Sequence, residues 1–362
     1  MKWSRNAIKL SVLLVICLIL HFYGADAGRV ENEYSNGYFL KISGFLRSVF
    51  GKLPFSAGDI IYGLLVAWML WNVGKFLFGI LKRGAIKPGR EFYLRAGYGL
   101  LVFCSVIYIL FNGLWGINYD RKGIAYQLQL EMKKYAGSDL IEINNLLIGK
   151  VNGSKEALLK RKAGYPDNRE LYRMVDDAYQ KVSVQYPFLR YHPVSIKTSM
   201  WGWLGNYTGF TGYYNPFTGE AQLNTTIPEF LQPFIACHEV AHQLGYAKEN
   251  EASFVGYLAA SHSGDPLLQY SVYLELFIYA NRNLNGFDSL EAKRFRKTLS
   301  ADVLKDLKLW ATFNRNHRSF AEPLISWVYD KYLMGNRQPG GILSYDEVTG
   351  FVISYYKKYG RL

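Results

Sequence analysis

Hydrophobic and polar positions divide the chain into an apolar first third and an amphipathic remainder. Three apolar runs precede residue 118: IKLSVLLVICLILHFYG (8–24), IIYGLLVAWMLWNVGKFLFGIL (60–81) and AGYGLLVFCSVIYILFNGLWGI (96–117). The last two reach the ~20 residues that a helix needs to cross a bilayer. Lys75 interrupts the second run near one end, where its stem can reach the headgroups. We therefore predict three transmembrane helices and a membrane anchor over residues 1–117.

The first run has two interpretations. It is shorter than the other two, and ADA at residues 25–27 resembles the cleavage site of a signal peptide. His21, Phe22 and Tyr23 can instead extend the run into the membrane interface, as in an uncleaved anchor. We favour the anchor, and the predicted topology is the same in both cases.

The loop between the second and third runs predicts the topology. Its sequence, KRGAIKPGREFYLR (82–95), carries five basic residues against one acid. By the positive-inside rule such a loop is cytoplasmic, so the third run leads outward and residues 118–362 are extracytoplasmic, at the cell membrane. Four aromatic residues suit the membrane interface: Trp68, Trp71, Trp115 and Tyr119.

The remainder of the chain, residues 118–362, predicts one mostly helical domain with a small β-sheet. Helical periodicity marks NRELYRMVDDAYQKVSVQY and nearly everything after Pro228, whereas PVSIKTSM (193–200) alternates like a strand. The turn signal NPFTG precedes EAQLN (220–224), which predicts a returning strand. The predicted fold class is a membrane-anchored α+β protein.

Charge and cysteine content narrow the partners. The formal net charge of +13 fits either nucleic acid or an anionic membrane surface. No basic run is interleaved as a nucleic-acid groove requires, so we expect the lipid bilayer as a partner and no nucleic acid. The three cysteines, Cys17, Cys104 and Cys237, form no pair placed to close a disulfide.

The stretch FIACHEVAHQLGYAKENEASFVGYL (234–258) carries the candidate chemistry. On a helix, His238 and His242 project from one face, so two imidazoles can hold one metal ion. Glu239, next to His238, can reach a water on that metal as a general base. Roughly 0.004 such H-E-x-x-H patterns are expected here by chance. Two alternatives remain: a buried helix with hydrogen-bonded histidines, and a metal site without catalysis.

A third ligand is expected on the helix that follows. Asn250 is a good N-cap, and Glu251 then heads an apolar face with Val255. Glu251 is therefore the predicted ligand, and Glu249, before the helix, is predicted to be solvated. A shift of the helix start by two residues would exchange their roles. His262, three turns further on, is the next candidate.

The motif His238-Glu239-x-x-His242 with Glu251 resembles the zincin metallopeptidases of the glutamate-ligand branch, called gluzincins. The whole chain also resembles the uncharacterised membrane family known as domain of unknown function 3810, through LWGINYDR, YYNPFTGEAQLN, HEVAHQLG with ENEASF, and GGILSYDEV. The zincin resemblance implies Zn²⁺ as the cofactor, a peptide or protein substrate, and residues 220–224 as an edge strand along the cleft. An ordinary hairpin is the alternative for residues 220–224. Many gluzincins carry an acid four residues after the ligand glutamate, where this chain has Val255.

The predicted function is a membrane-anchored zinc metallopeptidase with an extracytoplasmic catalytic domain. His238, His242 and Glu251 would hold Zn²⁺, and Glu239 would activate water. The alternative is a non-enzymatic membrane sensor or scaffold that binds a peptide or a cell-wall component. An intramembrane protease is disfavoured, because the motif lies far along the chain from any apolar run. The tyrosines that could donate to an oxyanion are Tyr213, Tyr214, Tyr246 and Tyr345, with none singled out.

Overall fold

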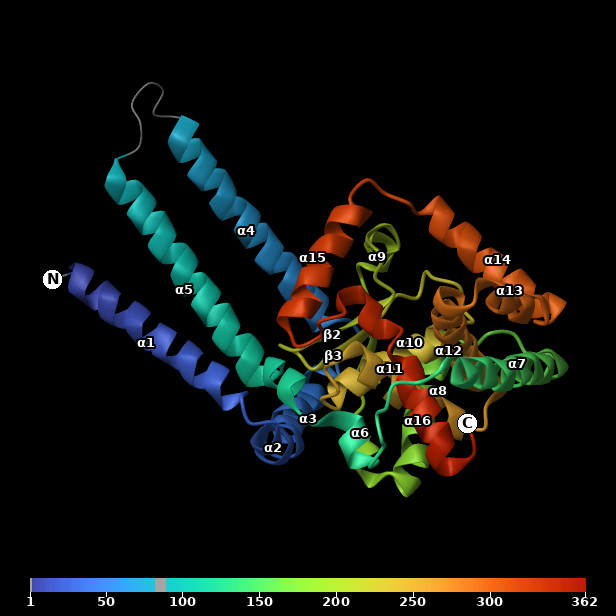
Figure 1. Ribbon diagram of the computed structural model, residues 1–362. Helices are drawn as coiled ribbons and strands as arrows, with labels where there is room; N and C mark the ends of the chain where they lie inside the picture. The colour runs from blue at the N-terminus through green and yellow to red at the C-terminus, as the bar shows by residue number, and fades with distance from the viewer. Residues whose placement is uncertain (1, 82–88) are drawn as a thin grey trace.

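Three long helices extend from one side of a helical domain in the computed structural model, which describes residues 2–81 and 89–362 (Figure 1). They are α1 (Lys2–Tyr23), α4 (Ala57–Leu81) and α5 (Arg90–Leu114). Each is long and apolar enough to cross a membrane. With the small sheet described below, they confirm the predicted membrane-anchored α+β class. Three basic residues of the topology argument, Lys82, Arg83 and Lys87, lie outside the described residues.

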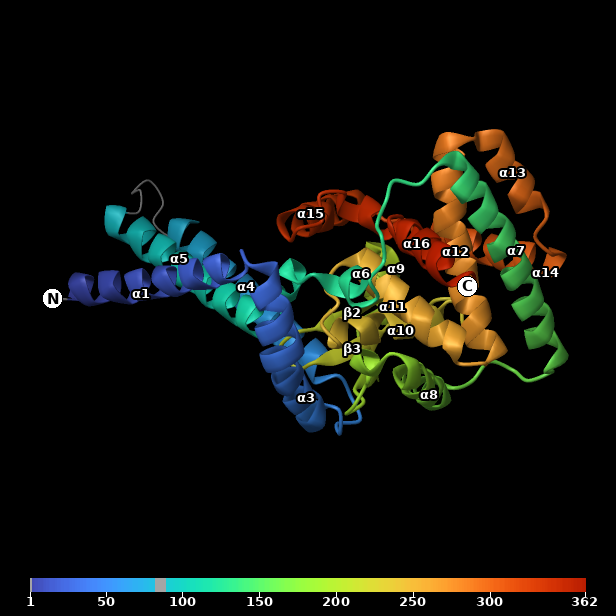
Figure 2. The ribbon, with the colours of Figure 1, turned by 60° about the horizontal axis from the view of Figure 1, so that its bottom comes forward.

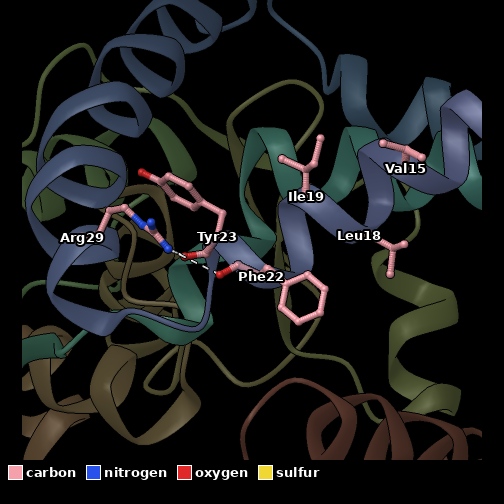
Figure 3. Close-up of a pocket in the computed structure, with 6 residues that line it drawn as sticks. All are labelled: Val15, Leu18, Ile19, Phe22, Tyr23 and Arg29. Carbon is pink, nitrogen blue, oxygen red and sulfur yellow. Dashed lines mark hydrogen bonds between the residues drawn. The ribbon is translucent and has the colours of Figure 1, made fainter.

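The end of α1 marks a change from apolar to polar surroundings. Figure 3 shows Val15 and Ile19 on the apolar part of the helix, with Arg29 beyond its end. The guanidinium of Arg29 donates to the carbonyl oxygens of Phe22 at 3.4 Å and Tyr23 at 3.0 Å. A cation at the C-terminal end of a helix satisfies carbonyls that lack partners and complements the helix dipole. Arg29 therefore closes the apolar helix where the polar chain begins.

The segment between the first two spans packs onto the domain. It contains α2 (Ala27–Arg29), the π-helix η1 (Val30–Tyr38) and α3 (Phe39–Phe50). Glu31 in η1 forms a buried ion pair with Arg121, at 2.7 Å. The sequence assigned this segment to the membrane anchor, residues 1–117. The ion pair between Glu31 and Arg121 joins it to the helical domain.

A three-stranded sheet lies beside the centre of the domain. Its order is β1 (Ile196–Thr198), β3 (Glu220–Leu223), β2 (Gly212–Asn215), with β1 parallel and β2 antiparallel to β3. The prediction that residues 220–224 form an edge strand was wrong, because β1 covers the second side of β3. The hairpin partner is visible in the local sequence, but the parallel partner comes from 25 residues upstream. In the hairpin of β2 and β3, the strand at the edge of the sheet is β2.

Helices build the rest of the domain and its main hydrophobic core. Short elements follow the third span: η2 (Gly116–Asp120) and α6 (Gly123–Gln127). The longer helices are α7 (Gly137–Lys160), α8 (Asn168–Gln185), α10 (Gln232–Gln243), α11 (Glu249–His262), α12 (Pro266–Phe287), α13 (Ser289–Lys297), α14 (Ala301–Asn316), α15 (Glu322–Gly335) and α16 (Val348–Tyr359). Shorter pieces are η3 (Pro187–Leu189), α9 (Gly202–Thr208) and η4 (Gly341–Tyr345). Figure 2 shows α10 and α11 enclosed among the other helices.

Helix α10 is buried along its whole length, so its polar residues must find partners inside the protein. Pro233 opens the helix, where a missing N–H costs nothing. Gly245 ends it with a φ of +86°, a left-handed conformation that favours glycine, as the sequence predicted. The stretch from 238 to 242 is therefore held rigidly in the core.

Candidate metal centre

The two histidines and a glutamate meet where α10 packs against α11. His238 and His242 lie one turn apart on α10, with ring centroids separated by 4.7 Å. Helix α11 approaches α10 closely because Gly256 faces the backbone of α10. A Cβ at Gly256 would lie only 3.1 Å from the backbone nitrogen of His238. Glu249, in the first turn of α11, is thereby brought to the histidine pair.

Three ligand atoms converge on one point. The Oε2 atom of Glu249 lies 3.0 Å from Nε2 of His238 and 3.4 Å from Nε2 of His242. The two Nε2 atoms are 3.1 Å apart. All three side chains are buried, and this group could hold a metal ion. The predicted pairing of His238 with His242 is therefore confirmed in its geometry.

Glu251 does not join this group. Its carboxylate lies 3.6 Å from the Lys248 ammonium and packs against Gly123, on the other side of α11. The helix begins at Glu249 with Lys248 as its N-cap, two residues before the predicted start. The structure therefore replaces Glu251 by Glu249 as the carboxylate that faces the histidines. The prediction that Glu249 is solvated was wrong.

The change of register follows from a cap that is distant in the sequence. The backbone N–H of Glu249 donates to the side-chain oxygen of Gln338, at 2.8 Å. Asn250, the expected cap, instead lies inside the helix and donates to Glu347 at 2.8 Å. His262, the other candidate, ends α11 with its ring nitrogens near Leu258 and Gln185, away from the histidine pair.

Each of the three side chains is oriented by a further hydrogen bond. Nδ1 of His242 lies 2.7 Å from the Tyr246 carbonyl oxygen, and Nδ1 of His238 lies 3.2 Å from the Ser253 hydroxyl. The Tyr329 hydroxyl donates to Oε1 of Glu249 at 3.0 Å. These contacts leave the two Nε2 atoms and Oε2 directed at the common point. Such outer partners fix the orientation of metal-binding side chains.

Sequence reasoning missed Ser253 and Tyr329 for different reasons. Ser253 lies four residues after Glu249, so a search from the correct glutamate would have reached it. Tyr329 lies 80 residues away, and no local pattern connects it with the site. Of the tyrosines considered from the sequence, Tyr345 stacks its ring on that of His238, with centroids 6.1 Å apart, whereas Tyr246 meets His242 through its backbone carbonyl.

Burial and mutual attraction set the protonation of the cluster. Burial lowers the pKa of His238, whereas at His242 the attraction of Glu249 outweighs burial and raises the pKa to about 9. Burial opposes ionisation of Glu249, but His242 and His238 hold its pKa well below the usual range. An ionised carboxylate beside two ring nitrogens forms a site that attracts positive charge.

Glu239 lies beside this cluster, but its side chain is not one of the three that converge on the candidate metal position. Burial raises the pKa of its carboxyl to about 8, and its Oε2 atom has no hydrogen-bond partner among the described residues. Strand β2 comes close because residue 212 is glycine, where a Cβ would lie 2.8 Å from Oε1. Glu239 therefore places a buried carboxyl group between the candidate metal position and the edge strand β2.

The cluster opens into a cleft of about 790 Å³. Its walls include His238, Glu239, Glu249 and the β2 residues Gly212 and Tyr213. The cleft is large enough for several residues of a polypeptide or for a small molecule of ordinary size.

The third span ends against the cluster. Trp115, directly after α5, donates from Nε1 to the His242 carbonyl oxygen at 3.3 Å. Trp115 and Tyr119 are only 5% and 3% exposed, so their side chains pack inside the protein instead of lying on its surface. Because many residues separate the HEVAH motif from the apolar runs, its position in the sequence predicts a site far from the membrane. The contact between Trp115 and His242 shows that this separation along the chain does not correspond to a separation in space. The candidate metal centre adjoins the end of a span.

Comparison with known families decides the affiliation of the chain. A family described as "Protein of unknown function (DUF3810)" matches residues 34–353. The chain belongs to this family. No curated protein and no solved structure matches it significantly. The family description assigns no activity, so functional argument for this DUF3810 member depends on the geometry of the site.

Proposed function

We propose that this protein is a membrane-anchored zinc metallopeptidase, in which His238, His242 and Glu249 hold Zn²⁺. The observation that carries the proposal is the convergence of their ligand atoms, 3.0, 3.1 and 3.4 Å apart. A tetrahedral ion with bonds of 2.0–2.1 Å has ligand–ligand edges of about 3.3 Å. Two imidazoles and one carboxylate are a typical catalytic zinc set, with a fourth position left for water.

Zinc bound there would supply Lewis-acid activation of a water and of the substrate carbonyl. Glu239, whose raised pKa the charge of a bound cation would bring down, takes the proton of the attacking water and delivers it to the leaving amine. The open edge of β2, which lines the cleft beside Glu239, aligns an extended peptide or protein substrate by backbone hydrogen bonds. The Tyr329 hydroxyl donates its proton to Glu249, and the Tyr345 hydroxyl lies 3.2 Å from that of Tyr329, so of this pair Tyr345 is the one with a proton to offer the oxyanion.

The domain acts outside the cytoplasmic membrane, to which α1, α4 and α5 anchor it. The basic loop of residues 82–95 supports this orientation. The three candidate membrane helices support the anchorage.

The test uses the full chain, purified in a mild detergent. We expect one zinc per chain and cleavage of members of a peptide library, and Glu239→Gln should retain zinc but lose at least about 10²-fold in rate. The absence of bound metal after growth with zinc would refute the proposal. Stoichiometric zinc without cleavage of any library member would favour the alternative of a sensor or scaffold.

A further inference from the structure

The cleft that contains the candidate metal centre is not confined to the domain. Part of its wall comes from two membrane-spanning helices: Tyr62 and Leu65 from α4, and Ile107 and Phe111 from α5. Tyr62 also stacks on Tyr213 of the edge strand, with ring centroids 6.0 Å apart. One continuous cavity therefore joins the surface of the spans to the edge strand and the metal cluster.

These lining positions lie within the depth of the bilayer. Helices α4 and α5 have 25 residues each, a length of about 37 Å, against a hydrocarbon thickness of about 30 Å. Leu65 lies five residues beyond Ile60, where the apolar run begins, or about 7 Å along the helix. Ile107 lies seven residues before Leu114, the end of α5, or about 10 Å. The part of the cleft that Leu65 and Ile107 line therefore lies at the depth of the lipid acyl chains.

Helix α15 forms the opposite side of this opening. Its inner face lines the cleft with Ile325, Tyr329 and Tyr332, and the ring of Tyr332 lies 6.3 Å from that of Phe111 in α5. Its outer face carries Leu324 and Trp327, which are 64% and 59% exposed. In Figure 2, α15 lies on the side of the domain nearest the three spans. An apolar outer face in that position is suited to contact lipid.

We infer that the cleft opens sideways into the bilayer between α4, α5 and α15, and that it receives polypeptides whose apolar anchor lies in the same membrane. This inference rests on the proposed peptidase function and names its substrate class. The polarity of the cleft matches such a substrate, because Leu65, Ile107 and Ile325 can contact the anchor while His238 and Glu239 face the peptide. A single side chain, Trp115, bridges the end of α5 and the His242 carbonyl oxygen. Because an extended chain advances by about 3.3 Å per residue, we expect the scissile bond to lie within about ten residues of the substrate's apolar anchor.

The experiment places the full-length protein in vesicles of phosphatidylethanolamine and phosphatidylglycerol. One quenched-fluorescent peptide library is supplied in two forms, unmodified and with a terminal palmitoyl chain. We expect at least a tenfold faster cleavage of the palmitoylated form. Leu65→Trp, which fills the opening, should lower the ratio of the two rates at least fivefold. The matched control is Leu64→Trp, on the outer face of the same helix and 66% exposed, which should preserve the ratio.

Equal rates for the two library forms, or an equal ratio in Leu65→Trp and the wild type, would overturn the inference and leave the peptidase proposal intact. A binding measurement separates the two further. In zinc-loaded Glu239→Gln, a photoreactive residue at position 65 should cross-link the palmitoylated peptides, and one at position 64 should not. Cross-linking of phospholipid alone from position 65 would identify a structural lipid site and contradict the inference. Peptide cross-linking without hydrolysis in the wild type would support the route but refute the peptidase.

Discussion

The Oε2 atom of Glu249 lies 3.0 Å from Nε2 of His238, on the inner side of α11. Glu251, two residues later, faces the opposite way and lies near Lys248 and Arg121. Both carboxylates are about 5% exposed, so burial alone does not distinguish them. Direction on the helix decides their roles, because Glu249 meets ring nitrogens and Glu251 meets cationic side chains.

Removal of Glu249 should therefore abolish tight metal binding. We expect Glu249→Ala to lower zinc affinity by several orders of magnitude, because one of three converging ligands is lost and two neutral imidazoles remain. Zinc titration of the detergent-solubilised protein against a chelating indicator measures the affinity.

The matched variant Glu251→Gln should keep zinc affinity within a few-fold of the wild type, since its carboxylate points away from the cluster. Because burial outweighs the attraction of Lys248 and Arg121 and raises the pKa of Glu251, neutralising this carboxylate should leave the thermal midpoint unchanged or slightly higher. If Glu251→Gln lost zinc and Glu249→Ala retained it, the ligand set given by the structure would be wrong.

The parts of the site that the sequence predicted are those set by local geometry. The grouping of His238, Glu239 and His242 follows from the helical repeat alone. The helix stop follows from glycine at position 245, which adopts the left-handed backbone, φ +86°, that ends a helix. The third carboxylate could not be predicted, because Gln338, 89 residues away, caps α11 and places its first turn two residues earlier. A local N-cap preference of about 1 kcal/mol is easily outweighed by such tertiary contacts.

The same distinction holds for the fold. The apolar runs predicted three spans, since their length and composition are local properties. The parallel pairing of β1 with β3 and the burial of Trp115 against His242 are long-range contacts, which the pattern of a single chain does not encode visibly. The error about the edge strand and the unforeseen burial of Trp115 both arose from such long-range contacts.

Tyr329 should tune the metal through Glu249. The Tyr329 hydroxyl donates to Oε1 and leaves Oε2 for the metal, so Tyr329→Phe is expected to lower zinc affinity by about 10- to 100-fold. Tyr345→Phe is the matched control, because its hydroxyl lies 3.2 Å from that of Tyr329 and has no direct contact with Glu249. Competition with a chelator of known affinity compares the two. A similar loss in both variants would show that the pair acts as a unit.

The buried pair of Glu31 and Arg121 should make stability depend on pH. Burial opposes ionisation of Glu31, but hydrogen bonds and attraction from Arg121 lower its pKa below the usual value. A lowered folded-state pKa gives a stabilisation that is complete above the unfolded pKa of about 4.3 and is lost as pH falls through the lower, folded value. Glu31→Gln leaves Arg121 buried without a counter-charge, which should cost about 3–5 kcal/mol at neutral pH.

Thermal unfolding in detergent between pH 3 and 7 measures this difference between wild type and variant. The gap should be widest at neutral pH and should narrow below about pH 4. Glu33→Gln, at an exposed position two residues along η1, should change stability by no more than about 0.5 kcal/mol. A gap that stayed constant across the range would mean that the charge of Glu31 does not contribute to folding.

The basic loop predicts opposite exposure of two glycines that tolerate a side chain. Gly89, at the start of α5, and Gly149, on α7, are both exposed, and an added Cβ at either would meet no atom within 4 Å from the described residues beyond its chain neighbours. After replacement of Cys17, Cys104 and Cys237, single cysteines at these positions should react differently with a membrane-impermeant maleimide on intact cells. Gly149→Cys should be labelled at once, and Gly89→Cys only after the membrane is permeabilised, because the basic residues around it favour the cytoplasmic side. Outward labelling of Gly89→Cys alone would invert the topology and place the candidate metal centre in the cytoplasm.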